Sequence, residues 1–149
     1  MKYLKIFEST ENIPDWKSVL LELSDYFVEL EDDGCECEYV VGYKSQRNDN
    51  FYWKLSLGEN DTITGIDGGS SESIAEDISE LESYLRMGNQ MVLSVDMYLP
   101  YDEQNEAKTL EKFSEVLKVY NIVKKRMSGY ESQVKIHHLR RIEILLYKI

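Results

Sequence analysis

The first regular pattern in the chain is an apolar stripe at helical spacing. Its members recur every three or four residues, which places them on one side of a helix: Trp16, Val19, Leu20, Leu23, Phe27 and Leu30. Asn12 followed by Pro14 suits the cap and first turn of a helix. The run Asp32-Asp33-Gly34 suits its end. The pattern therefore predicts a helix between these two signals.

Strand-like alternation follows directly after this helix. One alternating set is Cys35, Cys37, Tyr39, Val41 and Tyr43, and a second is Phe51, Trp53, Leu55 and Leu57. The polar segment from Gln46 to Asn50 separates them, so the two runs predict a β-hairpin with one face toward a core. Glu59-Asn60-Asp61 is typical of a second turn, and Thr62 to Ile66 is expected to form a short third strand.

A second helix is predicted after the loop Asp67-Gly68-Gly69-Ser70-Ser71. Ser73 and Glu76 fit a capping box, and Gly88 fits the helix end. The buried stripe of this helix would consist of Ile74, Ile78, Leu81 and Leu85.

The rest of the chain reads as strand, helix and strand. Residues Met91, Leu93, Val95, Met97 and Leu99 alternate as a strand that Pro100 ends. Asp102 can cap a long helix that runs to about Ser128 and Gly129, with a stripe of Leu110, Phe113, Val116, Leu117, Tyr120 and Val123. The segment from Val134 to Ile149 predicts one long strand or two short ones.

These elements predict an α+β domain in the order α-β-β-β-α-β-α-β. The natural arrangement has two layers, a mainly antiparallel sheet with helices on one face. The length of 149 residues suits a single domain that spans residues 1–149, in which residues 1–8 form a short targeting or edge segment.

Composition points to a soluble chain in a reducing compartment. We expect no secretion signal, and no apolar run approaches the ~20 residues that cross a bilayer. Cys35 and Cys37 are too close in sequence for an unstrained disulfide, so reduced thiols in a cytosol fit best.

Charge is unevenly distributed along the chain. Residues 1–106 contain 24 acidic and 7 basic residues, whereas residues 107–149 contain 4 acidic and 10 basic ones, and the net charge is −11. An acidic protein of this kind is a poor candidate for direct binding to nucleic acid or to an anionic membrane. The opposed charges of the two segments also favour self-association into a homo-oligomer.

Candidate chemical motifs are weak. Cys37 with His137 or His138 lacks any motif of a nucleophile and its base, and Cys35-x-Cys37 supplies only half of a zinc site. The acidic run at residues 29–33 lacks the spacing of a calcium loop. The segment Gly68-Gly69-Ser70-Ser71 resembles a phosphate cradle, but Asp67 and Glu72 flank it and no P-loop lysine follows. We therefore predict no catalytic residue, no metal site and no cofactor.

The strongest functional signal is a segment without cations. Between Leu55 and Leu85 there is no Lys or Arg, while eight acidic residues occur: Glu59, Asp61, Asp67, Glu72, Glu76, Asp77, Glu80 and Glu82. Such a patch could imitate a phosphate backbone and bind a basic groove on another protein. The alternative is a solvated helix face that aids solubility and suits the helix dipole.

Two segments carry a resemblance to known proteins. The opening segment resembles the start of small accessory proteins of large tailed bacteriophages: Met1-Lys2-Tyr3-Leu4-Lys5-Ile6-Phe7-Glu8-Ser9. The segment from Phe27 to Gly34 resembles a short stretch of sequence in uncharacterised phage proteins. In one class of the accessory proteins a head protease cleaves after Ile or Leu, any residue and Glu, a pattern that Ile6-Phe7-Glu8 fits.

The resemblance implies a phage-encoded, non-enzymatic protein that binds and modulates a host protein in the host cytoplasm. Such a protein could inhibit a defence enzyme or mimic a nucleic acid. Three alternatives stay open: an internal head protein of the virion, a protein that binds a small ligand such as a nucleotide, and an immunity protein that neutralises a toxin. The hypothesis of a small-ligand-binding protein depends on the loop at residues 68–71 and on an aromatic strand face of Tyr39, Phe51 and Trp53.

Overall fold

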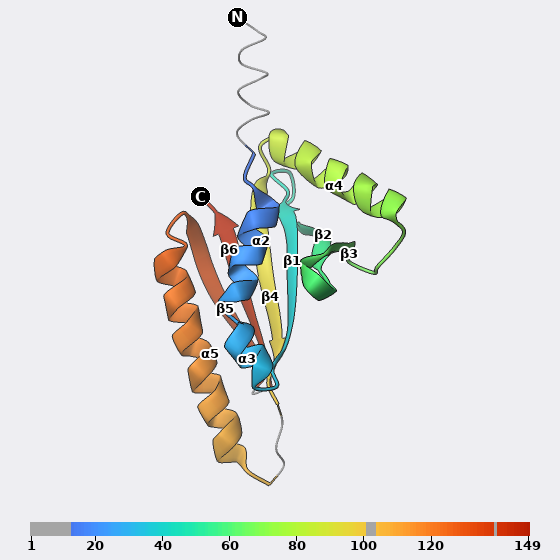
Figure 1. Cartoon of the computed structure of the whole chain (residues 1–149). Coiled ribbons are helices and arrows are strands. Elements are labelled where there is room, and N and C mark those ends of the chain that lie inside the picture. The colour runs from blue at the N-terminus through green and yellow to red at the C-terminus, as the bar shows by residue number, and fades with distance from the viewer. Residues whose placement is uncertain (1–12, 101–103, 139) are drawn as a thin grey trace, which may run out of the picture.

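The computed structural model describes residues 13–100, 104–138 and 140–149 (Figure 1). Its helices are α2 (Trp16–Asp25), α3 (Val28–Asp32), α4 (Ser71–Arg86) and α5 (Glu106–Arg126), with a short 3-10 turn, η1 (Glu59–Asp61). Its strands are β1 (Glu36–Lys44), β2 (Phe51–Leu57), β3 (Ile63–Gly65), β4 (Gln90–Tyr98), β5 (Tyr130–His138) and β6 (Arg141–Lys148).

The strands form one six-stranded sheet in the order β3-β2-β1-β4-β6-β5, and every neighbouring pair is antiparallel. The predicted α+β class is confirmed, and of the two predictions for the C-terminal segment the two-strand form is correct. Two segments carry the resemblance. Met1 to Ser9 lies outside the described residues, and Phe27 to Gly34 falls on α3 and the residues that flank it. None of the described helices is long and apolar enough to span a bilayer.

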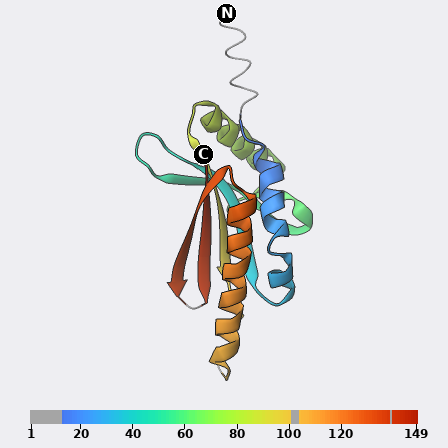
Figure 2. The ribbon, with the colours of Figure 1, turned by 90° about the vertical axis from the view of Figure 1, so that its left-hand side faces the viewer.

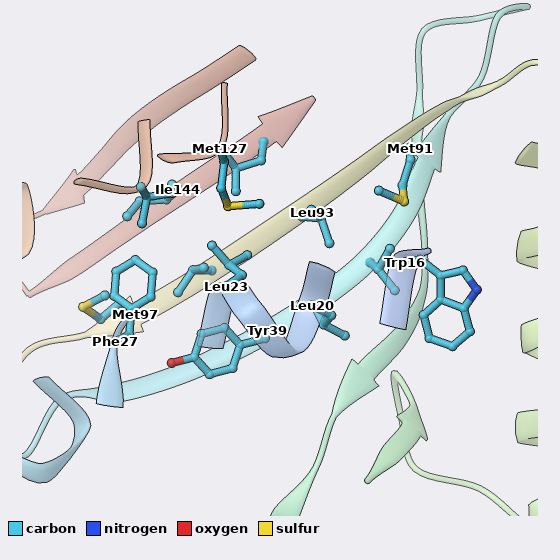
Figure 3. Close-up of a cluster of buried hydrophobic side chains, with 14 of the residues drawn as sticks. Trp16, Leu20, Leu23, Phe27, Tyr39, Met91, Leu93, Met97, Met127 and Ile144 are labelled. Atoms are coloured by element: carbon cyan, nitrogen blue, oxygen red, sulfur yellow. The ribbon is translucent and has the colours of Figure 1, made fainter. Parts of the chain in front are cut away.

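The helices cover one face of the sheet and leave the other open (Figures 1 and 2). The core lies between the two layers, where α2 presents Leu20 and Leu23 to β1 and β4 (Figure 3). Met127, after α5, and Ile144, on β6, complete the cluster from the other side. All of these side chains are buried, as the predicted stripes require.

The first helix begins later than predicted and is broken once. Asp15 is its cap and accepts a hydrogen bond from the Ser18 backbone N–H at 3.3 Å, so Pro14 precedes the cap and Asn12 lies outside the described residues. The helix stops at Asp25, where the Tyr26 and Phe27 N–H groups donate to carbonyls three residues back at 3.3 and 3.1 Å, and the Ser24 hydroxyl also donates to the Leu21 carbonyl at 2.8 Å. After the break Phe27 enters the core fully buried.

The turn at Gly34 is confirmed in detail. Gly34 has φ of +102°, a conformation that glycine adopts without strain, and the Cys35 N–H donates to the Leu30 carbonyl at 2.9 Å. This arrangement closes α3 and directs the chain into β1.

The β1–β2 hairpin contains a bulge that changes which side chains face the core. Val41 pairs with Leu55 but Gly42 pairs with Trp53, so Lys54 is an extra residue in β2. Because strand side chains alternate, the insertion puts Leu55 on the helix side and Trp53 on the open side. The predicted single face of Phe51, Trp53, Leu55 and Leu57 is therefore wrong, and Tyr39 does not share a face with Phe51 and Trp53.

The caps of the two later helices also differ from the prediction. Ser70, not Ser73, caps α4, since its hydroxyl accepts from the Ser73 N–H at 3.3 Å. Asn105 caps α5 by accepting from the Lys108 N–H at 3.3 Å, whereas the predicted cap Asp102 lies outside the described residues. The predicted stripes hold in part: Leu81 and Leu85 of α4 and Val116 and Val123 of α5 are buried, whereas Ile74 and Ile78 are half-buried and Leu110 is exposed, so that prediction was wrong for Leu110.

Candidate protein-binding surface

The acidic residues of η1 are held by a closed turn between β2 and β3. The Thr62 N–H and hydroxyl both donate to the Glu59 carbonyl, at 3.2 and 2.8 Å, and Asp61 has a positive φ of 59°. The turn predicted from Glu59-Asn60-Asp61 is thus confirmed. It leaves the side chains of Glu59 and Asp61 exposed to solvent.

Helix α4 carries a line of carboxylates on its outer side. Glu72, Glu76 and Glu80 are exposed and follow one another at intervals of four residues. Like charges at this spacing destabilise an isolated helix by a few tenths of a kcal/mol, about 0.2–0.5 per pair. Glu80 is partly compensated because it accepts from Lys54 at 2.8 Å.

The remaining predicted acids are placed differently from this line. Asp77 is half-buried and leans toward the end of β3, where a Cβ on Gly65 would lie 3.3 Å from its carboxylate. Glu82 is also half-buried, and Asp67 is exposed in the loop that precedes α4. Glu76 and Glu80 line a shallow hollow together with Ser79, Ser83, Tyr84 and Met87.

A groove brings the η1 acids together with two acids, Asp25 and Glu31, that the sequence did not assign to the binding surface. It has a volume of about 550 Å³ and is lined by Ser24, Asp25, Val28, Glu31, Cys37, Tyr39, Leu57, Gly58 and residues 59–61. Asp25 and Glu31 come from α2 and α3, on the far wall from Glu59 and Asp61. The sequence gives no sign that these two walls meet, since more than 25 residues separate them, and only the folded structure brings them together.

The lining of this groove also includes two neutral titratable groups, Cys37 and Tyr39. Burial raises the pKa of the Cys37 thiol from 9.0 to about 12. Burial also raises the pKa of Tyr39, whose hydroxyl donates a short hydrogen bond to Glu31. Cys37 is therefore a protonated thiol at neutral pH, which is the opposite of an activated nucleophile. The sheet order also puts β4 and β6 between Cys37 on β1 and the two histidines of β5.

The charges of the groove are uncompensated. Among the described residues, no Lys, Arg or His pairs with Asp25, Glu59 or Asp61. The described part of the chain also contains no group of three or more His, Cys, Asp or Glu side chains that could hold a metal ion.

The open face of the sheet carries a second acidic feature. Glu38, Asp96 and Glu143 lie directly opposite one another on β1, β4 and β6, and we call them the acidic row. They border a hollow of about 170 Å³ whose other wall includes Trp53 and Ile66.

The acidic row is already engaged within the protein. Arg141 donates to Asp96, while Glu143 accepts from the Ser94 hydroxyl at 3.2 Å and lies 3.4 Å from the His137 ring. Periodicity could not reveal this row, because it depends on the register between strands that are distant in sequence.

The glycine-serine loop before α4 acts as a turn and a cap. Gly68 and Gly69 have φ of +81° and +114°, and Ser70 then caps the helix. Asp67 and Glu72 remain exposed on either side of it. This geometry matches the turn-and-cap interpretation of the loop, and the flanking carboxylates oppose an anionic ligand.

Comparison of the chain with protein-family models, with curated proteins and with solved structures finds no match.

Proposed function

We propose that the protein is a non-enzymatic binding protein that attaches to a basic surface of another protein. The contact would use the eight predicted acidic residues together with Asp25 and Glu31. One observation carries the proposal: the groove between α2–α3 and η1 gathers four carboxylates, and none of the four has a cationic partner among the described residues.

The acidic lining of the groove suits the charged ends of long cationic side chains. Arg and Lys carry apolar stems that can lie against Leu57 and Cys37, while their charged heads reach the carboxylates at the rim. Val28, which is exposed at the edge of the groove, adds an apolar contact. Charge-assisted hydrogen bonds of this kind are stronger than neutral ones and give the contact its direction.

The groove is a better candidate than the acidic row on the open face. In the row, Asp96 and Glu143 already accept hydrogen bonds from neighbouring side chains, so a binding partner would have to displace those donors. In the groove, Glu59 and Asp61 are exposed on a turn, and within the described parts of the chain they have no ion pair that a partner would have to displace.

The resemblance to bacteriophage accessory proteins supplies the class of partner. We propose that it is a host protein, such as a defence or nucleic-acid enzyme, whose basic groove normally receives a phosphate backbone. The line of carboxylates on α4 would extend the contact beyond the groove, as in a mimic of nucleic acid. The place of action under this proposal is the host cytoplasm.

The test is capture of a binding partner from host lysate with the full chain, at low and at high salt. A single retained protein whose binding weakens as salt rises supports the proposal, because exposed charges are screened. The purified partner then allows a comparison of affinities with the variant Glu59→Gln/Asp61→Asn/Glu72→Gln/Glu76→Gln. Asn tolerates the positive φ at position 61, so this variant keeps the turn.

The matched control is Glu36→Gln/Asp49→Asn/Glu106→Gln/Glu111→Gln, which changes the net charge equally at exposed sites elsewhere. We expect the first variant to lose at least tenfold in affinity, roughly 1.4 kcal/mol, and the control to lose much less. Equal losses in the two variants would mean that net charge alone drives binding and would refute the assigned surface.

A further inference from the structure

Among the strands that the structure describes, β5 forms one long edge of the sheet with no neighbour on its outer side. The strand order puts β5 at one end and β3 at the other. β3 has three residues, whereas β5 has nine. A free edge of that length presents unpaired backbone groups and is a template for another strand.

The backbone groups that face this edge can be identified. The Ile149 N–H donates to the Gly129 carbonyl at 3.0 Å, one step beyond the opposed residues Tyr130 and Lys148. In an antiparallel pair, residues alternate between bonding to the partner and pointing away from it. Glu131, Gln133 and Lys135 therefore bond toward β6, and the N–H and C=O groups of Ser132, Val134 and Ile136 point to the free edge.

We propose that this edge pairs with β5 of a second copy of the chain, antiparallel about a two-fold axis at Gln133. The two sheets then join into one continuous sheet. This interface goes beyond the proposed function and does not depend on it.

The register is chosen by charge complementarity. An axis at Gln133 puts Glu131 of one copy opposite Lys135 of the other, and symmetry makes this pair twice. An axis at Val134 would instead oppose Glu131 to His137, and one at Ser132 would oppose Glu131 to Gln133. A lysine on an isolated strand edge discourages pairing. In this register each Lys135 instead lies opposite one carboxylate of the other copy.

The same register satisfies the edge-facing backbone. Ser132 comes opposite Val134, and both point their N–H and C=O groups outward, so they form hydrogen-bonded pairs. Tyr130 comes opposite Ile136 on the helix side of the sheet. Ile136 is 53% exposed, and pairing would cover it with the tyrosine ring of the other copy.

An apolar stripe on α5 supports contact on the same side. Leu110, Phe113, Leu117 and Tyr120 share one side of α5 by their spacing. The Tyr120 hydroxyl lies 3.2 Å from the Ser132 hydroxyl, so this side is next to β5. Leu110 is 54% exposed. Phe113 and Tyr120 pack partly against the core of their own copy, so Leu110 is the exposed member of the stripe. A two-fold axis perpendicular to the sheet puts both α5 helices on the same face of the joined sheet.

The test is sedimentation velocity of the full chain over a concentration series. We expect a reversible dimer for the native chain. Glu131→Lys and Lys135→Glu, which each create like charges on both sides of the axis, should weaken dimerisation about tenfold. The double variant Glu131→Lys/Lys135→Glu should restore it, whereas a change in fold would not be restored. Circular dichroism checks that each variant keeps its secondary structure.

The position of the axis has its own readout. Gln133→Cys should form a disulfide-linked dimer on oxidation, because opposed residues of a non-hydrogen-bonded pair have Cα atoms about 4.5 Å apart. Lys135→Cys, on the same face two residues away, should not cross-link. A native chain that stays monomeric at every concentration overturns the proposal, as does equal cross-linking at the two positions or association that the charge variants leave unchanged.

Discussion

Arg141 donates two hydrogen bonds to the carboxylate of Asp96 on the neighbouring strand, at 3.1 and 3.0 Å. Asp96 is the middle member of the acidic row, with Glu38 on one side and Glu143 on the other. Like charges directly opposite one another in a sheet are destabilising. Arg141 therefore offsets a repulsion that the strand register creates.

The acidic row predicts opposite effects for two charge-removing substitutions. Glu38→Gln should raise the free energy of unfolding by about 0.5 kcal/mol, since it removes one of two repulsive contacts of Asp96. Arg141→Gln should lower it, because the row loses its cation. Urea unfolding at neutral pH measures both. Glu36→Gln is the control, since Glu36 lies opposite Tyr98 and not opposite a carboxylate; if Glu38→Gln behaves like this control, the row is not repulsive.

The bulge predicts that Gly42 cannot be replaced. A Cβ at this position would lie 2.8 Å from the Cα of Trp53 and closer still to the carbonyl oxygen of Tyr52. These are backbone atoms that cannot move aside, so Gly42→Ala should cost roughly 3 kcal/mol or more. Gly68→Ser is a useful comparison because no atom lies within 4 Å of a Cβ there, although its positive φ adds some strain. A Gly42→Ala protein of native stability would show that the bulge is wrongly placed.

Cys37 predicts a loss of stability in alkaline solution. Because its pKa is about 12 in the folded protein and 9.0 in an exposed thiol, the folded chain keeps a proton that the unfolded chain releases. The contribution is complete below pH 9 and is lost as pH rises from 9 toward 12. Between pH 9 and 10.5 this amounts to at most about 2 kcal/mol.

Comparison of the native chain with Cys37→Ala isolates this effect. Both proteins should lose stability through tyrosines, since burial also raises the pKa of Tyr43 and Tyr130 to about 12. The native chain should lose more between pH 9 and 10.5, as measured by urea unfolding at each pH. Parallel slopes for the two proteins would contradict the assignment of a buried, neutral thiol.

The caps of α4 predict unequal effects for two nearby serines. Ser70→Ala should lower the free energy of unfolding by about 1 kcal/mol, because it leaves the Ser73 N–H without its acceptor. Ser73→Ala removes the bond from its hydroxyl to the Ser70 carbonyl and the long bond that it accepts from the Ser70 hydroxyl at 3.4 Å, but it leaves the capped N–H satisfied and should cost less. Thermal unfolding of the two variants compares them directly. A larger loss of stability for Ser73→Ala than for Ser70→Ala would indicate that Ser73, and not Ser70, is the cap.

The fold class and the order of the elements could be predicted from the sequence because both follow from local spacing. The stripe at Leu20 and Leu23 and the alternation from Met91 to Leu99 each appear within one element, and the structure buries both. The capping residues were harder to predict, since several residues near the start of each helix can accept the same hydrogen bond. Ser70 and Ser73 differ only in which of them the loop brings into extended conformation.

The arrangement of charges could be predicted only in part. The cation-free segment that contains Glu59 and Asp61 is visible in the sequence, but their neighbours Asp25 and Glu31 become apparent only when α2–α3 packs beside η1. The acidic row depends on register across three strands, and the reversal of Trp53 depends on one inserted residue, Lys54. Periodicity within a single element carries no information about any of these.

The place of β6 between β4 and β5 has a consequence for how the chain is made. Of the strands in this sheet, β6 is the last to leave the ribosome, yet it joins β5 to the rest. Until it emerges, the long apolar strand β4 has one side unpaired and β5 has no neighbour in the sheet. Closure of the sheet must therefore wait until synthesis has passed Lys148, and a nascent chain stalled before Arg141 would expose the unpaired side of β4.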